Sequence, residues 1–418
     1  MFKTIGIIIP SVLIGGLFFE HIRFVLTHYH RNKGIKQYWI QEGEIEEIEN
    51  DLKIVLKWKQ KLFHSFSIAG RYVNPFLEWE DRNTTDIFAM IKYQLTRKNR
   101  NGLPCPNLEI NLPLAEPNFA LLNEFTMKSH LRQSIEQANK LLLLASMDAD
   151  SAVGFEDLPK RSTISKRDSG MDLADFTQMT VTWIGQSTCF IQMDGYNILT
   201  DPIFCSRTTG EWFGPKRLRP PPCSLSQLPP IDIVLISHNH YDHLDTNVLY
   251  ELGDSCTWYV IELDWWQEYK HDDKLLIASC PIQHWSGRHF FDVNSSLWCS
   301  FVCKTSAQSF FHCGDTGYCS VFKEIGQRYG PITLAALPIG SYEPRYFMCH
   351  QHMDPDEACL VHMDIQAKHS IGVHWGTFMM SDEHYMDPPK DFKIASEKYG
   401  LGKQVFTCHL GETIVLDI

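Results

Sequence analysis

The segment from Ser237 to Asp245 concentrates side chains that bind metals. Its sequence, SHNHYDHLD, holds three histidines and two aspartates in nine residues. Zinc accepts imidazole nitrogens and carboxylate oxygens, and a single tetrahedral ion takes about four ligands. Four candidate ligands within six residues cannot easily surround one ion. We therefore expect His238 and His240 to bind one metal, and Asp242 and His243 to bind a second.

A second metal requires further ligands, and three other residues stand just beyond apolar runs. They are His284 after KLLIASCPIQ, Asp315 after QSFFHCG and His374 after HSIGV. Residues that leave buried strands commonly carry function. A carboxylate between two cations can bridge them, so we expect Asp315 to be shared. The predicted ligand sets are His238, His240, His284 and Asp315 for one ion, and Asp242, His243, His374 and Asp315 for the other.

Two zinc ions at such a site would favour hydrolysis at neutral pH. Ions roughly 3.5 to 4 Å apart would hold a hydroxide between them and polarise a substrate oxygen. Asp242 and Asp315 are the carboxylates that we expect to act in catalysis. A closed zinc site or a set of surface histidines is the alternative interpretation. Iron or manganese could replace zinc, although a histidine-rich ligand set favours zinc.

The residues after Phe176 are expected to form the scaffold of this site. Short β-type runs follow one another there, and helical patterns occur at Asp354–Lys368 and Asp391–Tyr399. Many strands that end in ligand residues indicate two packed sheets flanked by helices. The predicted strands are MTVTWIG, TCFIQM, NILT, IDIVLIS, TWYVI, KLLIAS, LWCSFVC, QSFFHCG, TLAALP, HSIGVH, QVFTC and TIVLD.

The chain before residue 176 divides into three parts. Ile5 to Phe19 is uncharged but shorter than a full span of about 20 residues, so residues 1–30 are a candidate membrane anchor, with a signal peptide or a buried helix as alternatives. Basic residues after this segment favour keeping the rest of the chain on the cytoplasmic face. Residues 31–145 are expected to be helical and extended, and 146–175 to be a polar linker or insertion.

The overall composition restricts the classes of function. The chain has 418 residues, 44% of them hydrophobic, which is enough for a sizeable core. Its net charge of -12 provides no global basic surface, so nucleic acid is not an expected partner. The 13 cysteines include no CxxC pair, which indicates reduced thiols in the cytosol.

The pattern HxHxDH, followed by a separated His, Asp and His, resembles the metallo-β-lactamase superfamily from about Thr180 to the C-terminus. This resemblance implies an α/β protein with the αββα sandwich, a mainly helical N-terminal extension, and a catalytic domain at 176–418 that holds two Zn²⁺ ions. Asp201 in NILTDPIF matches the family's strand-end aspartate, which orients the ligands without binding metal. Longer phrases narrow the resemblance to the N-acyl phosphatidylethanolamine-hydrolysing phospholipase D family: GRYVNPF, GPKR, LPPID, SHNHYDHLD, IELDWW, GDTGY, IGSYEPR, QHMDPDEA and HWGTF.

That family resemblance implies a lipid substrate. The expected reaction converts N-acyl phosphatidylethanolamine to N-acylethanolamine and phosphatidic acid, by attack of the metal-bridging hydroxide on phosphorus. Gln351 and His352 match family positions close to the substrate head group, and Tyr241 could line the cavity. Packing around the ligands or simple hydrogen bonding is the alternative role for these three residues.

A membrane surface is the partner that such a substrate requires. The segment at Ile5–Phe19, the basic TRKNR sequence and the pair Trp212–Phe213 are candidate contacts with lipid. We therefore expect a membrane-associated protein at a cytoplasmic face, for example of an endomembrane. The sequence does not give the oligomeric state, so a homodimer is left open.

One departure from the family keeps other functions open. Between the ligand cluster and His284, TWYV runs almost directly into IELDWW, where the family has an additional apolar and aromatic passage. Either the cavity is reshaped or coding sequence has been skipped. The alternatives are a hydrolase of the same fold that acts on another small-molecule ester or lactone, and a lipid-binding protein that has lost turnover.

Overall fold

The computed structural model describes residues 64–65, 67–68, 70–76, 79, 101–131, 178–209, 214–255, 259–289 and 292–417. Several predictions lie outside these residues. They are the membrane anchor within residues 1–30, the polar linker at 146–175, the TRKNR contact and the Trp212–Phe213 contact. The three boundaries between the four predicted parts of the chain stay predictions.

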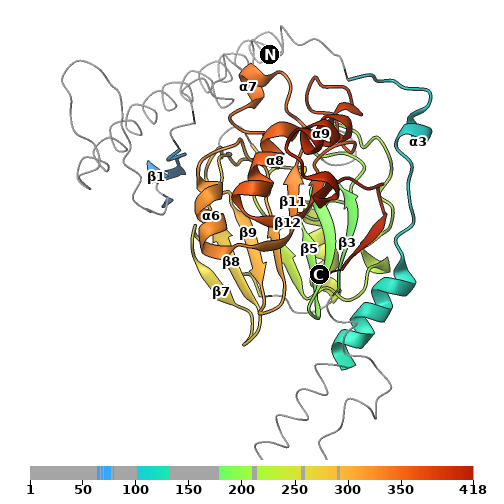
Figure 1. Cartoon of the computed structure of the whole chain (residues 1–418), viewed down its shortest axis with the longest axis vertical. Coiled ribbons are helices and arrows are strands. Elements are labelled where there is room, and N and C mark those ends of the chain that lie inside the picture. The colour runs from blue at the N-terminus through green and yellow to red at the C-terminus, as the bar shows by residue number, and fades with distance from the viewer. Residues whose placement is uncertain are drawn as a thin grey trace, which may run out of the picture.

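Two β-sheets form the centre of the molecule (Figure 1). The smaller sheet has five strands in the order β14-β3-β4-β5-β6. Its strands are β3 (Gln178–Gly185), β4 (Thr188–Met193), β5 (Tyr196–Thr200), β6 (Ile233–Leu235) and β14 (Thr413–Asp417). The larger sheet has seven strands in the order β13-β12-β11-β10-β9-β8-β7. Its strands are β7 (Glu268–Lys270), β8 (Leu276–Cys280), β9 (Ser300–Lys304), β10 (Ser309–His312), β11 (Ile332–Pro338), β12 (Ala367–Val373) and β13 (Val405–Phe406).

The smaller sheet buries apolar side chains on both faces. Successive side chains of a strand point to opposite faces, so Cys189 and Ile191 of β4 join the main core while Phe190 joins a second cluster. That second cluster also contains Leu122, from the helical residues 119–131, and Val248 of α5 (Thr246–Ser255). Helical residues therefore cover the outer face of this sheet.

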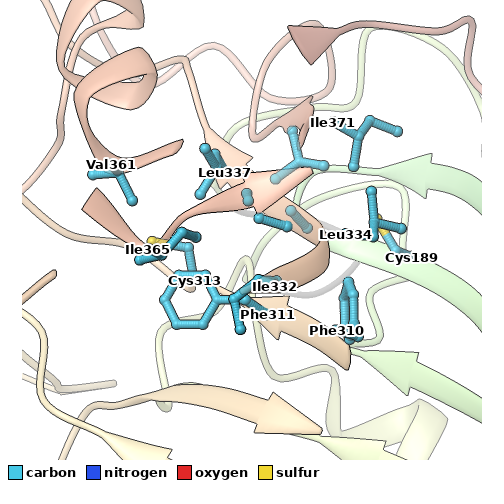
Figure 2. Close-up of a cluster of buried hydrophobic side chains, with 14 of the residues drawn as sticks. Cys189, Phe310, Phe311, Cys313, Ile332, Leu334, Leu337, Val361, Ile365 and Ile371 are labelled. Atoms are coloured by element: carbon cyan, nitrogen blue, oxygen red, sulfur yellow. The ribbon is translucent and has the colours of Figure 1, made fainter. Parts of the chain in front are cut away.

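The larger sheet is covered by α6 (Val321–Tyr329), α8 (Pro355–Asp364) and α9 (Asp387–Lys398) (Figure 1). Figure 2 shows both faces of this sheet. Phe310 and Leu334, which are paired across β10 and β11, lie toward Cys189 of the smaller sheet. The next side chain, Phe311, lies toward Val361 of α8. The order helix, sheet, sheet, helix confirms the predicted αββα sandwich.

Some predicted elements were wrong in extent or in kind. TWYVI was predicted as a strand, but residues 259–261 form none, and the side chains of Tyr259 and Val260 are 88% and 89% exposed. The helix predicted at Asp354–Lys368 ends at Asp364, because β12 begins at Ala367. The helix predicted at Asp391–Tyr399 starts earlier, at Asp387, since the first turn of a helix tolerates the proline that follows.

Parallel pairing brings the residues that follow several strands to one edge of the sandwich. β5 and β6 are parallel, with Thr200 opposite Leu235, so the residues beyond both strands are neighbours. β10, β11 and β12 are also parallel, which places Asp315 and His374 at a common edge. β8 runs in the direction of β10, because both pair antiparallel with β9, and this brings His284 to the same edge.

Glu324 of α6 gives a pH-dependent prediction for the stability of this scaffold. Its Oε2 has no hydrogen-bond partner among the described residues, and burial raises the pKa of Glu324 from 4.5 to about 7. The folded state therefore retains a proton that the unfolded state releases, and the stability contribution of Glu324 falls as the pH rises from 4.5 to about 7. We expect Glu324→Gln to gain stability relative to the unsubstituted protein across this range.

Urea unfolding at a pH near 5 and at a pH near 8 measures this gain. Glu397→Gln, at an exposed position on α9, is the control and should gain nothing between the two conditions. A Glu324→Gln effect of equal size at both pH values would contradict the prediction.

Candidate metal centre

The predicted ligands meet at the strand edge as two groups. Within each group, the ligand atoms all lie within 4.8 Å of one another. The first group contains His238, His240 and His284, and the second contains Asp242, His243, Asp315 and His374. The split of the HxHxDH segment between two metals, which the sequence predicts, thus agrees with the geometry.

Three ring nitrogens converge in the first group. His240 Nδ1 lies 2.7 Å from His238 Nε2 and 3.3 Å from His284 Nε2. Ligands of a tetrahedral zinc ion with zinc–nitrogen bonds of about 2.0–2.1 Å stand about 3.3 Å apart. The three nitrogens are therefore spaced to share one ion after only a small outward shift of the His238 ring.

The second group has nearly uniform separations. Asp315 Oδ2 lies 3.0 Å from His243 Nε2 and 3.1 Å from His374 Nε2. Asp242 Oδ2 lies 3.5 Å and 3.3 Å from the same two nitrogens. Asp315 Oδ2 is also 4.0 Å from His284 Nε2 of the first group. This carboxylate therefore lies between the two groups, as a bridging ligand requires.

Hydrogen bonds from the far side of three rings fix their orientation. His238 Nδ1 donates to Ser237 Oγ over 2.9 Å, and His284 Nδ1 donates to the Gln351 carbonyl oxygen over 3.0 Å. His243 Nδ1 donates to Asp201 Oδ2 over 2.8 Å. With the proton on Nδ1, each ring turns the lone pair of Nε2 toward its group, which is how partners outside a metal site select the tautomer of a ligand.

Asp201 connects both groups although it belongs to neither. Its Oδ1 accepts a hydrogen bond from the Ser237 N–H over 2.7 Å, and its Oδ2 accepts bonds from Ser237 Oγ over 2.7 Å and from His312 Nε2 over 2.8 Å. Burial opposes ionisation of Asp201, but His312 and His243 lower the pKa of this carboxyl below its ordinary range. The ionised carboxylate orients His243 directly and His238 through Ser237.

The electrostatics of the second group favour a cation. Burial alone would lower the pKa of His374, yet Asp315 and Asp242 raise it to about 9. The carboxylates thus stabilise positive charge at this position, and a divalent ion supplies that charge when the ring is neutral. In the first group, burial lowers the pKa of His238 and His284 and keeps both rings in the neutral form that binds metals.

Some buried polar atoms of the centre have no hydrogen-bond partner among the described residues. They include Asp315 Oδ1 and His374 Nε2. Buried polar groups almost always have hydrogen-bond partners, so atoms without one call for an ion or a water molecule. Together with the spacing and the tautomers, they show that the residues present fit two metal ions.

Three supporting residues were not predicted from the sequence. Ser237 relays the Asp201 contact to His238, and His312 donates to Asp201 from within β10. Gln186 Nε2 donates to Asp242 Oδ2 over 2.7 Å and so orients a ligand. A histidine inside the apolar run QSFFHCG was the available signal for His312, since a buried imidazole needs a partner.

The backbone is constrained at the same edge. Asp201, Ser341 and His374 have positive φ angles of 34°, 64° and 62°. Gly314, with φ 65°, stands so close to the ligand loop that an added Cβ would lie 2.8 Å from Ser237 Cβ. Left-handed conformations of residues other than glycine are unfavourable and concentrate at functional sites. They let the chain turn sharply after each strand and direct its side chains inward.

A cavity of about 500 Å³ lies over both groups of ligands, and most of its wall is apolar. Trp285, Val293, Met348 and Met380 contribute to that wall. Arg288 is the one lysine or arginine that lines it among the described residues. Its guanidinium group stands 4.2 Å from the centre of the Tyr241 ring. The cavity thus combines an apolar wall with one fixed positive charge.

Tyr241, Gln351 and His352 all line this cavity. Gln351 Oε1 accepts a hydrogen bond from Trp285 Nε1 over 2.7 Å, while the Gln351 carbonyl oxygen orients His284. His352 Nδ1 lies 3.9 Å from Asp315 Oδ2. Contact of these three residues with substrate stays a prediction, but each is placed where a bound molecule would reach it.

The fold and the paired ligand groups define a metal-dependent hydrolase of the metallo-β-lactamase type. In agreement, the family model described as Beta-lactamase superfamily domain matches residues 196–260 and 247–375. The chain is 22% identical to the solved structure of Igni18, a metallo hydrolase from Ignicoccus hospitalis, with a TM-score of 0.42 over 58% of this chain and 99% of that chain.

Two curated relatives narrow this class. The mitochondrial N-acyl-phosphatidylethanolamine-hydrolysing phospholipase D of Saccharomyces cerevisiae is 31% identical over 395 residues, which cover 88% of this chain and 80% of the relative. N-acyl-phosphatidylethanolamine-hydrolysing phospholipase D 1 of Caenorhabditis elegans is 38% identical over 50% of this chain and 67% of the relative. The chain belongs to the N-acyl phosphatidylethanolamine-hydrolysing phospholipase D family.

The contacts of Asp201 predict a loss of metal affinity on substitution. We expect Asp201→Asn to weaken zinc binding about 10- to 100-fold, because the amide keeps the shape of the side chain but presents an NH₂ group to donors. Competition with a chromophoric chelator measures the affinity, and thermal unfolding of the metal-free protein measures the effect on the fold.

Asp194→Asn is the matched control, since Asp194 lies at the β4–β5 turn with a positive φ of 45° that asparagine tolerates. Its zinc affinity should equal that of the unsubstituted protein. An unchanged affinity in Asp201→Asn would contradict the role assigned to this carboxylate.

Proposed function

We propose that this protein is a zinc-dependent phospholipase D that hydrolyses N-acyl phosphatidylethanolamine to N-acylethanolamine and phosphatidic acid. The observation that carries the proposal is the cavity, in which two groups of candidate metal ligands stand beneath an apolar wall that also carries the cationic Arg288. Acyl chains suit the apolar wall, and a phosphodiester suits the metals and the arginine. The names of the yeast and nematode relatives support the same substrate.

Arg288 is positioned to bind the anionic part of such a substrate. Its Nη1 donates to the carbonyl oxygens of Asn239 and Leu244 over 3.2 Å and 2.8 Å. The face of its guanidinium group packs on Tyr241. These contacts hold the group in place, and a fixed guanidinium offers its remaining N–H groups to phosphoryl oxygens in a planar fork.

Two zinc ions, when bound, supply a hydroxide at neutral pH and withdraw electron density from the phosphoryl oxygens. The oxygen of water bonds to phosphorus, and the bond from phosphorus to the ethanolamide oxygen breaks. The proton released by water ends on the leaving oxygen. The carboxylates of Asp242 and Asp315 would hold the positively charged metal ions. Arg288 binds a phosphoryl oxygen. Tyr241, Gln351 and His352 orient the head group from the cavity wall.

The proposal includes a membrane surface at the cytoplasmic face as the place of action, because the substrate is a bilayer lipid. Among the described residues, no helix is both long and apolar enough to span a membrane. In this proposal the predicted anchor within residues 1–30 attaches the chain to the membrane. The yeast relative is named as a mitochondrial protein.

The products provide the direct test of this reaction. Purified, zinc-loaded protein with N-acyl phosphatidylethanolamine in detergent micelles is expected to release N-acylethanolamine and phosphatidic acid. In ¹⁸O-labelled water, mass spectrometry should find the label in phosphatidic acid only, because water attacks phosphorus. Asp315→Asn, which removes the shared ligand, should abolish release.

Folded, zinc-loaded protein that leaves this lipid intact would contradict the proposal. Hydrolysis of a small ester or lactone under the same conditions would then favour the alternative hydrolase. Lipid binding without products would favour a protein that has lost turnover.

Replacing Arg288 with methionine removes the positive charge but keeps a long apolar side chain. We expect Arg288→Met to lower kcat/KM about 10- to 100-fold, since a hydrogen bond to a charged group contributes about 1.5–3 kcal/mol. The comparison is made at full zinc occupancy, because Arg288 also donates to the carbonyl oxygens of Asn239 and Leu244 beside the predicted ligands.

Arg328→Met is the matched control, since its guanidinium group also packs over an aromatic ring, 5.6 Å from the centre of Trp266, but away from the cavity. The control should keep the kcat/KM of the unsubstituted protein. An unchanged kcat/KM in Arg288→Met would remove Arg288 from the substrate site.

A further inference from the structure

A short segment of the N-terminal region packs against the loop that follows β8. Its β1–β2 hairpin pairs Ser67–Ile68 with Arg71–Tyr72 (Figure 1). The Tyr72 N–H donates to the carbonyl oxygen of Asn294 over 2.8 Å, and Arg71 Nη1 donates to the carbonyl oxygen of Val293. These contacts join residues that are more than 200 positions apart in the sequence.

Asn74 makes a second contact at the other end of the same loop. Its Nδ2 donates to the backbone carbonyl oxygen of His284 over 2.7 Å, and the side chain is only 2% exposed. Two residues further on, Phe76 is fully buried with its ring 6.0 Å from that of Trp265. The packing of Phe76 holds Asn74 in place, and a hydrogen bond shielded from water is stronger than one at the surface.

The braced loop, residues 284–294, carries functional groups along its length. His284 belongs to the first group of metal ligands, and Arg288 lines the cavity. The loop is closed on itself, since Ser286 and Asn294 exchange backbone and side-chain hydrogen bonds of 2.7 Å and 3.1 Å. Contacts at its two ends therefore bear on the positions of His284 and Arg288.

We propose that residues 71–74 are a brace for the metal centre. Asn74 is a positioning residue that sets where His284 stands relative to His238 and His240, and Arg71 and Tyr72 hold the far end of the same loop. Residues 71–74 then support the first metal site although they supply no ligand to it. This proposal concerns metal binding alone and is independent of which ester is hydrolysed.

The test compares two buried asparagines in the full-length protein. Asn74→Ala removes the bond to His284. Asn197→Ala is the matched control, because Asn197 is 3% exposed and its Nδ2 also donates to a backbone carbonyl oxygen over 2.7 Å, that of Pro230. The measurements are stepwise zinc affinity by chelator competition, the absorption spectrum of the cobalt(II)-loaded protein, and thermal unfolding of the metal-free protein.

We expect Asn74→Ala to lower the affinity for one of the two zinc ions about 10- to 100-fold, as changes beside a ligand do. The affinity for the other zinc ion should change by less than about threefold. The cobalt spectrum should change for one site only. Asn197→Ala should lower the unfolding temperature of the metal-free protein and leave both zinc affinities unchanged.

Two results would overturn the proposal. One is an Asn74→Ala protein with both zinc affinities intact, and the other is an equal weakening of both sites, which a general loss of stability would produce. Arg71→Met provides a second route if Asn74→Ala does not fold, because it removes a contact at the far end of the loop. Arg71→Met should lower the affinity for the same zinc ion in a folded protein. Unchanged zinc affinities would contradict the proposal that residues 71–74 brace the metal centre.

Discussion

The buried carboxylate of Asp201 is the constraint on which the metal centre depends. An ion of this kind is stable in the interior only when hydrogen-bond donors and opposite charge compensate for its lost hydration. Here the donors come from both sheets, since Ser237 follows β6 of the smaller sheet and His312 lies in β10 of the larger one. Satisfying one carboxylate therefore fixes the two sheets relative to each other at the edge where the ligands stand.

The same carboxylate explains why the two ligand groups form together. It orients His243 of the second group directly and His238 of the first group through Ser237. Around it the chain adopts positive φ angles at Asp201 and His374, which local preferences oppose. The packed sheets hold these conformations, so the rigidity of the scaffold supports the geometry of the site.

The ligands were predictable from residue type and spacing, because few segments place three histidines and two aspartates in nine residues. The two packed sheets were predictable from the many short strands that end in ligand-type residues. The supporting contacts were not, since His312 and Gln186 act through neighbours that only the folded chain brings near. TWYVI has the composition of a strand, yet composition alone does not show that a segment finds a pairing partner, and residues 259–261 have none.

The N-terminal phrase GRYVNPF illustrates the same limit. Its resemblance to the family could be read from the sequence, but the contact between Asn74 and His284 spans 210 positions and depends on where two distant segments meet. Long-range contacts of this kind are set by the whole fold rather than by local pattern. Residue type and spacing therefore located the ligands better than they located the residues that support them.

Arg288 is tied to the carbonyl oxygens of Asn239 and Leu244, and these two residues flank the ligands His240 and His243 in the chain. The positive charge of the cavity is thus hydrogen-bonded to the loop that carries the ligands His240 and His243. Thermodynamic linkage then applies between the two sites. If metals order this loop and thereby improve the binding of an anion at Arg288, the bound anion must raise the affinity for the metals by the same factor. An anion bound at Arg288 would then protect the protein from losing its ions.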